Sequence, residues 1–407
     1  MSLAKLNTAL LADVAKLAAE GRAKAAERII VGYVPPHDGR GPRYRLQGSE
    51  REFLRMNSNS YLSLSNHPDV LAAADRASHA FGAGPGAVRF IDGTFEPHLQ
   101  LEAGVARFVG RPAARVFNSA YTTVLGVALT LAGPETFWIG DELNHNCIIR
   151  AMRIANVPSA QRAIFKHNDL DDLAAHLDRV PDGTGRVIVI FDGIFSMRGD
   201  HAPVADIARV VAGHEHRFRD GVITVMDDSH GIGAYGATGR GTEEHCAASV
   251  DVFVGTFGKA FGVNGGFVAA SAEVVEAVRQ KADTYIYTNP LGAADAAAAV
   301  RAVELADGEE GRARLANLTA RTAQFRQGLQ ALGFESIPGP HAVVPLLVRD
   351  TARVRAMVAS LFECGILAVG LTFPVVPKGD ETIRFQINAA HTEIDIAEVL
   401  AALAPHA

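Results

Sequence analysis

The chain has 407 residues, of which 48% are hydrophobic and 21% charged, and its formal net charge is −6. These values are typical of a globular protein with more than one packed unit; they exclude a disordered chain and give no electrostatic reason to expect nucleic acid as a partner. Three widely spaced cysteines form neither a disulfide framework nor a metal motif, and no run approaches the about 20 apolar residues of a membrane span, so we expect a cytoplasmic protein that holds no metal.

Residues 1–59 are expected to form an N-terminal helical arm and a linker. Leucine and valine recur at helical spacing in residues 3–19, which predicts an amphipathic helix that docks on the body or on a second subunit. Glycine and proline are frequent in residues 32–49, which predicts a loop with a short hairpin. We expect its arginines, Arg40, Arg43 and Arg45, to be solvated.

Residues 60–290 alternate short apolar runs with helical patterns, and this alternation predicts a mostly parallel sheet covered by helices. A continuous run such as 187–191 is typical of a strand buried on both faces. The predicted strands are 115–117, 136–139, 163–165, 187–191, 222–226, 252–255 and 267–269. Ligands of such sheets bind outside the carboxyl ends of the strands, so chemistry is expected just after these runs.

Residues 291–407 show a different pattern and are expected to form a smaller α+β domain. The predicted helices are 293–305, 310–332 and 352–363, and the predicted strands are 342–348 and 382–387. The chain contains no internal repeat or low-complexity tract.

A lone lysine, Lys259, follows the predicted strand that ends at Gly255 and is surrounded by glycines. Glycine lets a ligand approach the backbone closely, and a confined lysine is useful if its amine forms a Schiff base. The residues alone are equally compatible with a surface lysine on a flexible loop. A Walker A loop is excluded, because Phe253 stands at the position of its first glycine.

An acid and a histidine, Asp227 and His230, directly follow the predicted strand 222–226. A carboxylate at a strand end can pair with a protonated pyridine nitrogen, whereas the simpler interpretation is a hydrogen-bonded structural pair. The glycine pattern of residues 231–236 is a weak dinucleotide fingerprint, because loop residues follow it where a helix should begin.

Several single residues allow both a functional and a structural interpretation. The helix start after Ser119 could bind phosphate or be an ordinary cap. His145 could stack on a flat ring or simply be hydrogen-bonded. Ser196 lacks the GxSxG context of a serine hydrolase. Arg384, within a strand-like run, could bind a substrate carboxylate or form a salt bridge.

Taken together, these segments resemble the α-oxoamine synthase family of fold-type I pyridoxal-phosphate enzymes. The resemblance extends from Asn57 to His391, and its order is specific. The motifs are Asn-x-Tyr-Leu (59–62), Ser-x-Tyr (119–121), Asn-His (144–145), Phe-Ser-Met (195–197), Asp-Asp-Ser-His (227–230), Thr-Phe-Gly-Lys (256–259), Tyr-Ile-Tyr-Thr (285–288), and Arg384 followed by His391. It implies a large cofactor-binding α/β domain with a mostly parallel seven-stranded sheet over 60–290 and a smaller α+β domain over 291–407.

The resemblance implies an enzyme, a C-acyltransferase that uses pyridoxal 5'-phosphate to condense a small, glycine-like amino acid with an acyl thioester such as acyl-CoA. The product is an amino ketone or a β-keto amino acid. Residues 87–94, 227–230 and 374–379 look most similar to the 2-amino-3-ketobutyrate CoA ligase (glycine C-acetyltransferase) subfamily. The alternatives are an 8-amino-7-oxononanoate synthase-like enzyme, a carrier-protein-dependent enzyme or a fold-type I aminotransferase. An idle binding protein is disfavoured, because every cofactor-contacting position carries a competent residue type.

The resemblance also implies roles for the residues around the cofactor ring. Lys259 would bind the cofactor's aldehyde and later move the substrate's α proton. Asp227 would pair with the ring nitrogen, and His145 would stack on the ring face. His230 would hydrogen-bond the ring's phenolic oxygen, with Ser196 nearby.

Further roles concern the phosphate and the substrate. The residues implied for the phosphate are Ser119, Ala120, Tyr121 and Thr256. Thr288 and Asn289 would reach the phosphate of a neighbouring subunit, because family sites lie at a homodimer interface. Arg384 and Asn59 would hold the amino acid's carboxylate.

Three positions depart from the family pattern. Ala120 stands where glycine is common, Arg198 where an acidic residue is usual, and Pro290 where a hydroxyl residue is common. Arg198 and Pro290 leave open either the acyl donor or the fine geometry of the phosphate site. Because carrier proteins are acidic, the basic segment 22–45 is a candidate contact for one.

Overall fold

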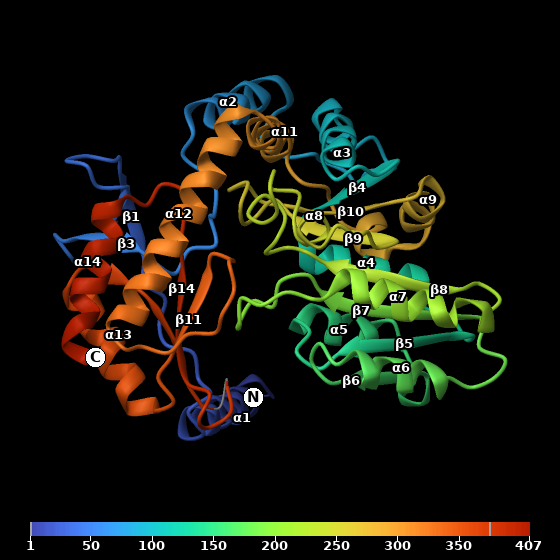
Figure 1. Cartoon of the computed structure of the whole chain (residues 1–407). Helices are drawn as coiled ribbons and strands as arrows, with labels where there is room; N and C mark the ends of the chain where they lie inside the picture. Colours follow the sequence, from blue (N-terminus) through green and yellow to red (C-terminus); the bar gives the residue numbers. More distant parts are fainter. Residues whose placement is uncertain (1, 374–375) are drawn as a thin grey trace. The chain divides into compact units, whose positions relative to one another are not determined.

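The structure is a computed structural model and describes residues 2–373 and 376–407 (Figure 1). It divides the chain into two compact units: a large unit, Asn59–Thr319, and a small unit that joins the chain up to Ser58 with Ala320–Ala407. Residues 291–319, expected in the C-terminal domain, belong to the large unit, because α11 (Ala293–Asp307) packs against α2 (Pro68–Phe81) and α3 (Glu96–Phe108).

The large unit is built on a seven-stranded sheet in the order β4-β10-β9-β8-β7-β5-β6. Its strands are β4 (Ala113–Phe117), β5 (Thr136–Asp141), β6 (Arg162–Phe165), β7 (Arg186–Asp192), β8 (Val222–Asp227), β9 (Val252–Thr256) and β10 (Gly266–Ala270). The five strands β6, β5, β7, β8 and β9 pair in parallel with one another. The strand β10 is antiparallel to both of its neighbours, β4 and β9. The expected mostly parallel sheet is therefore confirmed.

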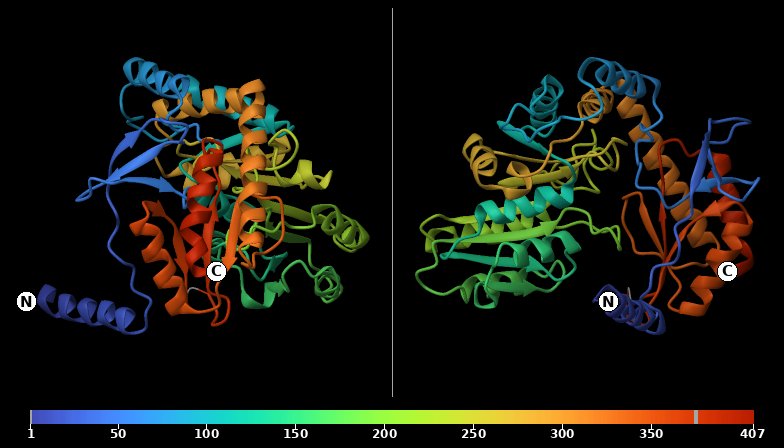
Figure 2. Two further views of the ribbon diagram at one scale, coloured as in Figure 1. Left: turned by 60° about the vertical axis from the view of Figure 1, so that its left-hand side comes forward. Right: turned by 180° about the vertical axis from the view of Figure 1, so that it is seen from behind.

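Helices cover both faces of this sheet, which explains why the interiors of its central strands are mainly apolar. Figure 1 shows α7 (Val204–His214) in front of the sheet, and the rear view in Figure 2 shows α4 (Ala120–Leu131) on the opposite face. Residues 187–191 of β7 are each at most 2% exposed, as expected for a strand between two helical layers. The remaining helices of the unit are α5 (Asn146–Ile154), α6 (Leu170–Asp178), α8 (Thr242–Cys246), α9 (Ala272–Lys281), α10 (Asp283–Ile286), and the short 3-10 helices η1 (Ser159–Gln161) and η2 (Glu215–Arg217).

The small unit contains two small sheets. One has the order β1-β2-β3-β12 and the other β11-β14-β13. The strands are β1 (Ile30–Val34), β2 (Arg43–Leu46), β3 (Glu52–Arg55), β11 (Val343–Leu347), β12 (Ile366–Leu367), β13 (Val369–Leu371) and β14 (Thr382–Gln386). Because β3 pairs with β12, the N-terminal segment is part of this unit and not a separate arm and linker.

Two helices of the small unit agree with the prediction, α1 (Ser2–Ala19) and α13 (Thr351–Glu363). The helix α14 (Glu393–Leu403) and the 3-10 helix η3 (Ala404–His406) are not predicted, and the division between the units falls within the predicted helix α12 (Glu309–Ala331). The apolar face of α1 is exposed, with Leu3 at 65% and Leu11 at 70%. Among the described residues, no helix combines the length and the apolar character needed to span a bilayer.

The expectation of solvated arginines in the linker is wrong for Arg43. Its guanidinium is buried and lies 2.7 Å from Asp395 and 3.0 Å from Glu398. A buried guanidinium is stable only when such partners compensate for lost hydration. Arg40 also pairs with Glu398, at 2.7 Å, and Arg45 with Glu52, at 3.3 Å. Arg40 and Arg45 remain largely exposed, as expected, and only Arg43 is buried. Much of the basic charge of segment 22–45 is thus compensated within the chain.

Candidate active site

A pocket with about 360 Å³ of empty space lies in the large unit, at the ends of several strands of the sheet. The predicted site residues that line it are Ala120, Tyr121, His145, Ser196, Asp227, His230 and Lys259. They come from segments far apart in the sequence. The pocket lies where ligands of open α/β sheets bind, and the structure brings these side chains together as the motifs imply.

Lys259 lies in a turn after β9, where glycines allow an unusually close packing of the chain. Gly262, with φ of +73°, could not be replaced without strain, since a Cβ there would lie 2.5 Å from the Ser65 nitrogen. The carbonyl of Lys259 accepts a hydrogen bond from the Gly262 nitrogen at 3.1 Å. This turn holds the lysine against the pocket wall and contradicts the interpretation of a flexible surface loop.

Asp227 is the last residue of β8 and is 7% exposed. Its Oδ1 accepts hydrogen bonds from the Ser229 hydroxyl at 2.5 Å and from the Ser229 nitrogen at 3.1 Å. Its Oδ2 lies 3.6 Å from the Cys147 Sγ. The first oxygen is thus fixed. Among the described residues, the second accepts a hydrogen bond from the Cys147 thiol, a weak donor, which leaves acceptor capacity for a ligand.

His230 is supported by Tyr61, a residue whose role the sequence does not predict. The Tyr61 hydroxyl lies 2.7 Å from Nδ1 of His230, and both side chains are buried. The same hydroxyl lies 3.4 Å from Oδ1 of Asn59. The signal in the sequence is the Asn-x-Tyr-Leu motif, which contains both Asn59 and Tyr61.

His145 caps the start of α5, and its backbone nitrogen donates to Oδ2 of Asp192 at 2.8 Å. Burial lowers the pKa of the His145 imidazole, and the nearby Lys259 lowers it further against the opposing effect of Asp227. The ring is therefore neutral at physiological pH. A neutral flat ring suits stacking on another aromatic ring.

Asp192, a buried residue of the pocket wall, is another position that the sequence analysis misses. It ends β7 as Asp227 ends β8, and the two residues are direct register partners. Burial, and then the charge of Asp227, raise the pKa of Asp192 well above its ordinary value. A carboxyl at the end of a buried strand is the signal that could have found it.

The start of α4 borders the pocket through Ala120 and Tyr121. A Cβ on Gly266, the first residue of β10, would lie 2.2 Å from the Ala120 nitrogen, so only glycine allows this approach. The N-terminus of a helix favours an anion. Ser119 and Thr256 are not among the lining residues: the Ser119 hydroxyl accepts from the Thr122 nitrogen, and the Thr256 hydroxyl donates to the Gly265 carbonyl.

The other predicted site residues lie elsewhere. Thr288 and Asn289 follow α10 on the surface of the large unit, where the Asn289 carbonyl accepts from the Asn118 side chain at 2.7 Å. Arg384 lies on β14 of the small unit. When the amide oxygen of Gln386 faces the Arg384 guanidinium, it accepts a hydrogen bond from Nε at 2.7 Å. The first two positions of segment 374–379 lie outside the described residues.

Comparisons with known proteins identify the class of protein. A family model described as aminotransferase class I and II matches residues 51–403. The 8-amino-7-oxononanoate synthase of Geobacter metallireducens is 37% identical over 87% of this chain and 88% of its own length. The 2-amino-3-ketobutyrate coenzyme A ligase of Escherichia coli is 36% identical over 85% of each chain. The solved serine palmitoyltransferase of Sphingomonas wittichii has a TM-score of 0.87 at 27% identity, covering 99% of this chain and 97% of its own.

The chain therefore belongs to the class I and II aminotransferase family, whose members have the fold-type I architecture described above. Within it the chain is an α-oxoamine synthase, an enzyme of the pyridoxal-phosphate-dependent C-acyltransferase type. The family inferred from the motifs is confirmed. The two named relatives are almost equally similar to it, so similarity does not choose between them.

The pocket fits the family's cofactor. It offers an amine for an aldehyde at Lys259, a carboxylate for a ring nitrogen at Asp227 and a neutral flat ring at His145. The glycine-permitted approach of β10 to the start of α4 leaves the helix terminus beside the same space. Within the described part of the chain, no group of three or more histidines, cysteines and carboxylates is arranged to hold a metal ion.

Proposed function

We propose that this enzyme condenses a small, glycine-like amino acid with an acyl-CoA, or an equivalent acyl thioester, to give an amino ketone or a β-keto amino acid. The observation that carries the proposal is one pocket that holds the amine of Lys259, the carboxylate of Asp227 and the neutral imidazole of His145. The relatives named as 8-amino-7-oxononanoate synthase and 2-amino-3-ketobutyrate coenzyme A ligase support it.

The cofactor-holding residues follow from this proposal. Asp227, fixed by Ser229, would bind the ring nitrogen, and His145 would cover one ring face. His230, supported by Tyr61, and Ser196 would contact the ring's phenolic oxygen. The residues proposed to hold the phosphate are Ser119, Ala120, Tyr121 and Thr256. When bound, pyridoxal 5'-phosphate supplies an electron-accepting ring that stabilises negative charge at the amino acid's α carbon.

The remaining work falls to the chain's own side chains. Lys259 would hold the cofactor before the amino acid arrives, and its amine would then take the α proton as a general base, since Lys259 lines the pocket. Asn59 and Arg384 bind the amino acid's carboxylate; a guanidinium can do so with two parallel hydrogen bonds and thereby fix its orientation. The oriented α carbon then attacks the thioester carbonyl, and the thiol leaves.

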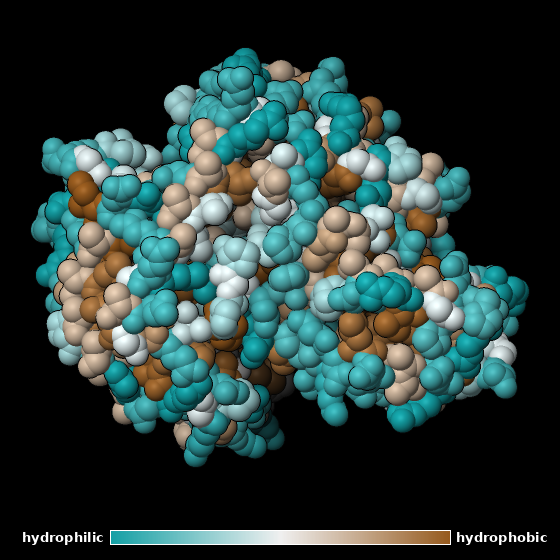
Figure 3. Space-filling model, viewed as in Figure 1, coloured by the Kyte–Doolittle hydropathy of each residue, from teal (hydrophilic) through white to brown (hydrophobic). Residues whose placement is uncertain are grey.

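We propose a homodimer in which Thr288 and Asn289 reach the partner's phosphate. Support comes from the large unit, where Phe90 (61% exposed), Leu99 (54%) and Tyr287 (75%) line one open surface pocket. Such a group of exposed apolar side chains commonly marks an interface. On the face drawn in Figure 3, hydrophilic side chains surround several separate apolar groups. Light scattering that finds a monomer at assay concentration would contradict this proposal.

The decisive test is a matrix of small amino acids against acyl thioesters of graded chain length, read by mass spectrometry. We expect thiol release that depends strictly on one amino acid, with a matching condensed product. An acyl carrier protein is included as a second thioester carrier, because Arg198 leaves the donor open. Amino transfer to a keto acid without thiol release would instead identify an aminotransferase.

A further inference from the structure

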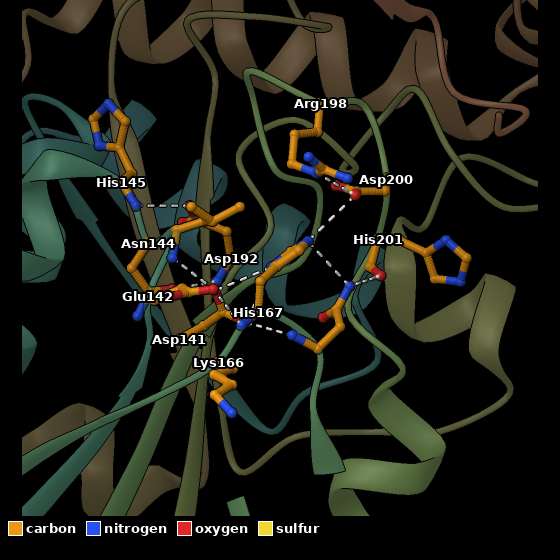
Figure 4. Close-up of polar contacts among 12 residues, drawn as sticks. Asp141, Glu142, Asn144, His145, Lys166, His167, Asp192, Arg198, Asp200 and His201 are labelled. Carbon is orange, nitrogen blue, oxygen red and sulfur yellow. Dashed lines mark hydrogen bonds and ion pairs between the residues drawn. The ribbon is translucent and has the colours of Figure 1, made fainter. Parts of the chain in front are cut away.

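A charged cluster beside the pocket contains side chains that the proposed function does not use. Figure 4 shows His167, in the turn after β6, between two carboxylates. Its Nδ1 lies 3.1 Å from Oδ1 of Asp141, and its Nε2 lies 3.2 Å from Oδ2 of Asp200. Arg198 donates from Nε to the same Asp200 oxygen at 2.8 Å. The two carboxylates come from different segments, so the imidazole bridges them.

The first of these segments, residues 141–145, ends in the pocket. Oδ1 of Asp141 accepts from the Leu143 nitrogen at 2.8 Å and thereby shapes the turn. Asn144 continues it, donating to the Ile190 carbonyl at 2.9 Å and accepting from the Asp192 nitrogen at 3.1 Å. His145, which lines the pocket, is the next residue. His167 is therefore connected to His145 through Asp141 and the turn of residues 141–145. His145 carries the ring that we propose covers the cofactor.

The second segment, residues 193–200, also reaches the pocket. It is a tight loop in which the Phe195 nitrogen donates to the Asp200 carbonyl at 3.0 Å. The His167 ring lies edge-on to Phe195, with centroids 4.3 Å apart and planes at 83°. Phe195 stands between Ile194 and Ser196, and these two neighbours line the pocket. His167 thus supports this loop through both a carboxylate and an aromatic ring.

The electrostatics keep the bridge intact at neutral pH. Burial alone would lower the pKa of His167, but its hydrogen bonds to Asp141 and Asp200 outweigh burial and raise the pKa to about 9. The same contacts, with Arg198, hold the pKa of Asp200 below its ordinary value despite burial. Oδ1 of Asp200 has no hydrogen-bond partner among the described residues. The hydrogen bonds that stabilise the buried Asp200 carboxylate, from His167 and Arg198, are therefore accepted by Oδ2. The charged or titratable groups facing this site are Asp141, Glu142, Arg198, Asp200 and His201.

We propose that His167 is a positioning residue that ties residues 141–145 to residues 193–200 and so holds His145 and Ser196 at the pocket. It touches neither substrate nor cofactor. The expected effect of His167 on kcat rests on the proposed function, whereas its expected effect on the order of residues 193–200 does not.

The test compares His167→Gln with a matched control, His214→Gln. His214 also bridges two groups, the Val210 carbonyl at 2.7 Å and the Asp178 carboxylate at 3.2 Å, but does not line the pocket or contact the two segments. Glutamine has one amide nitrogen in place of two ring nitrogens and carries no charge, so it does not reproduce the charged bridge. Asp200→Asn, which keeps the size and removes the charge, is the second variant should His167→Gln fold poorly.

Hydrogen–deuterium exchange of the cofactor-free protein gives a readout that is independent of the reaction. We expect peptides covering residues 193–200 to exchange about tenfold faster in His167→Gln, with a smaller increase in Asp200→Asn and none in His214→Gln. In the cofactor-loaded enzyme we expect kcat to fall about tenfold in His167→Gln with KM within about twofold, because alignment and not binding is lost. The kcat of the wild type should also decline as pH rises through about 9, a limb that His167→Gln lacks.

The outcomes separate the two proposals. Unchanged exchange in both variants, or faster exchange with unchanged kcat and pH profile, overturns the positioning role of His167. Faster exchange in an enzyme that condenses no amino acid with any thioester leaves the tie standing and overturns the proposed function.

Discussion

The large and the small unit use polar side chains on strands in opposite ways. In the large unit, Asp141, Asp192 and Asp227 are the last residues of β5, β7 and β8, three adjacent parallel strands. In the small unit, Arg384 lies in the middle of β14, between two antiparallel neighbours. Parallel strands end at one edge of their sheet, so side chains at their ends gather there. An antiparallel sheet has no such edge.

The cost of gathering three carboxylates at one edge is met differently for each. Asp141 pairs with His167, and Asp227 is fixed by Ser229 with one oxygen left for a ligand. Asp192, flanked by Asp227, has its pKa raised by burial. In the small unit, Arg43 and Asp395 compensate each other directly within the core. The large unit thus keeps one carboxylate available for chemistry, whereas the small unit uses its buried pair for stability.

The largest effect should come from the edge of the parallel sheet. Lys259→Ala is expected to lower turnover by about 10⁴-fold, because it removes the proposed general base. It should also abolish the visible absorption of the lysine-bound cofactor while leaving the fold intact. Steady-state assay, absorption spectra and circular dichroism check this. Turnover within about tenfold of wild type would refute the role of Lys259.

The approach of β10 to α4 should be nearly as sensitive. Gly266→Ala places a Cβ against the Ala120 nitrogen and should weaken cofactor binding about tenfold to a hundredfold by shifting the helix terminus. Gly213→Ala, where a Cβ would meet nothing within 4 Å, is the matched control. Fluorescence titration with pyridoxal phosphate measures both; equal affinities would remove this terminus from the phosphate site.

A substitution in the small unit should separate substrate from cofactor binding. Arg384→Ala is expected to raise KM for the amino acid about tenfold to a hundredfold, the value of a lost charged hydrogen bond, and to leave cofactor affinity unchanged. Arg349→Ala is the control, because its exposed pair with Glu335 lies in the same unit. An unchanged KM would contradict a role for Arg384 in binding the carboxylate.

The smallest effect is the pH dependence of stability. Because the pKa of His167 is raised from 6.5 to about 9, its stabilising contribution is complete below pH 6.5 and is lost as pH rises through about 9. The difference in denaturant midpoint between wild type and His167→Gln should therefore shrink over this interval. Denaturation at graded pH measures it. A difference that is constant with pH would mean that the ion pairs do not stabilise the fold.

The sequence by itself determined the parallel sheet and much of the pocket. Buried strands need continuous apolar runs, and several pocket-lining residues follow those runs, so Lys259, Asp227 and His145 could be found from local pattern and motif order. The sequence did not predict contacts between residues that lie far apart in the chain. The union of β3 with β12, the burial of Arg43 beside Asp395, and the bridge from His167 to Asp141 and Asp200 join residues separated by tens to hundreds of positions. Only the tertiary structure decides such contacts, because whether a charged side chain is solvated or buried depends on which distant partner the fold brings to it.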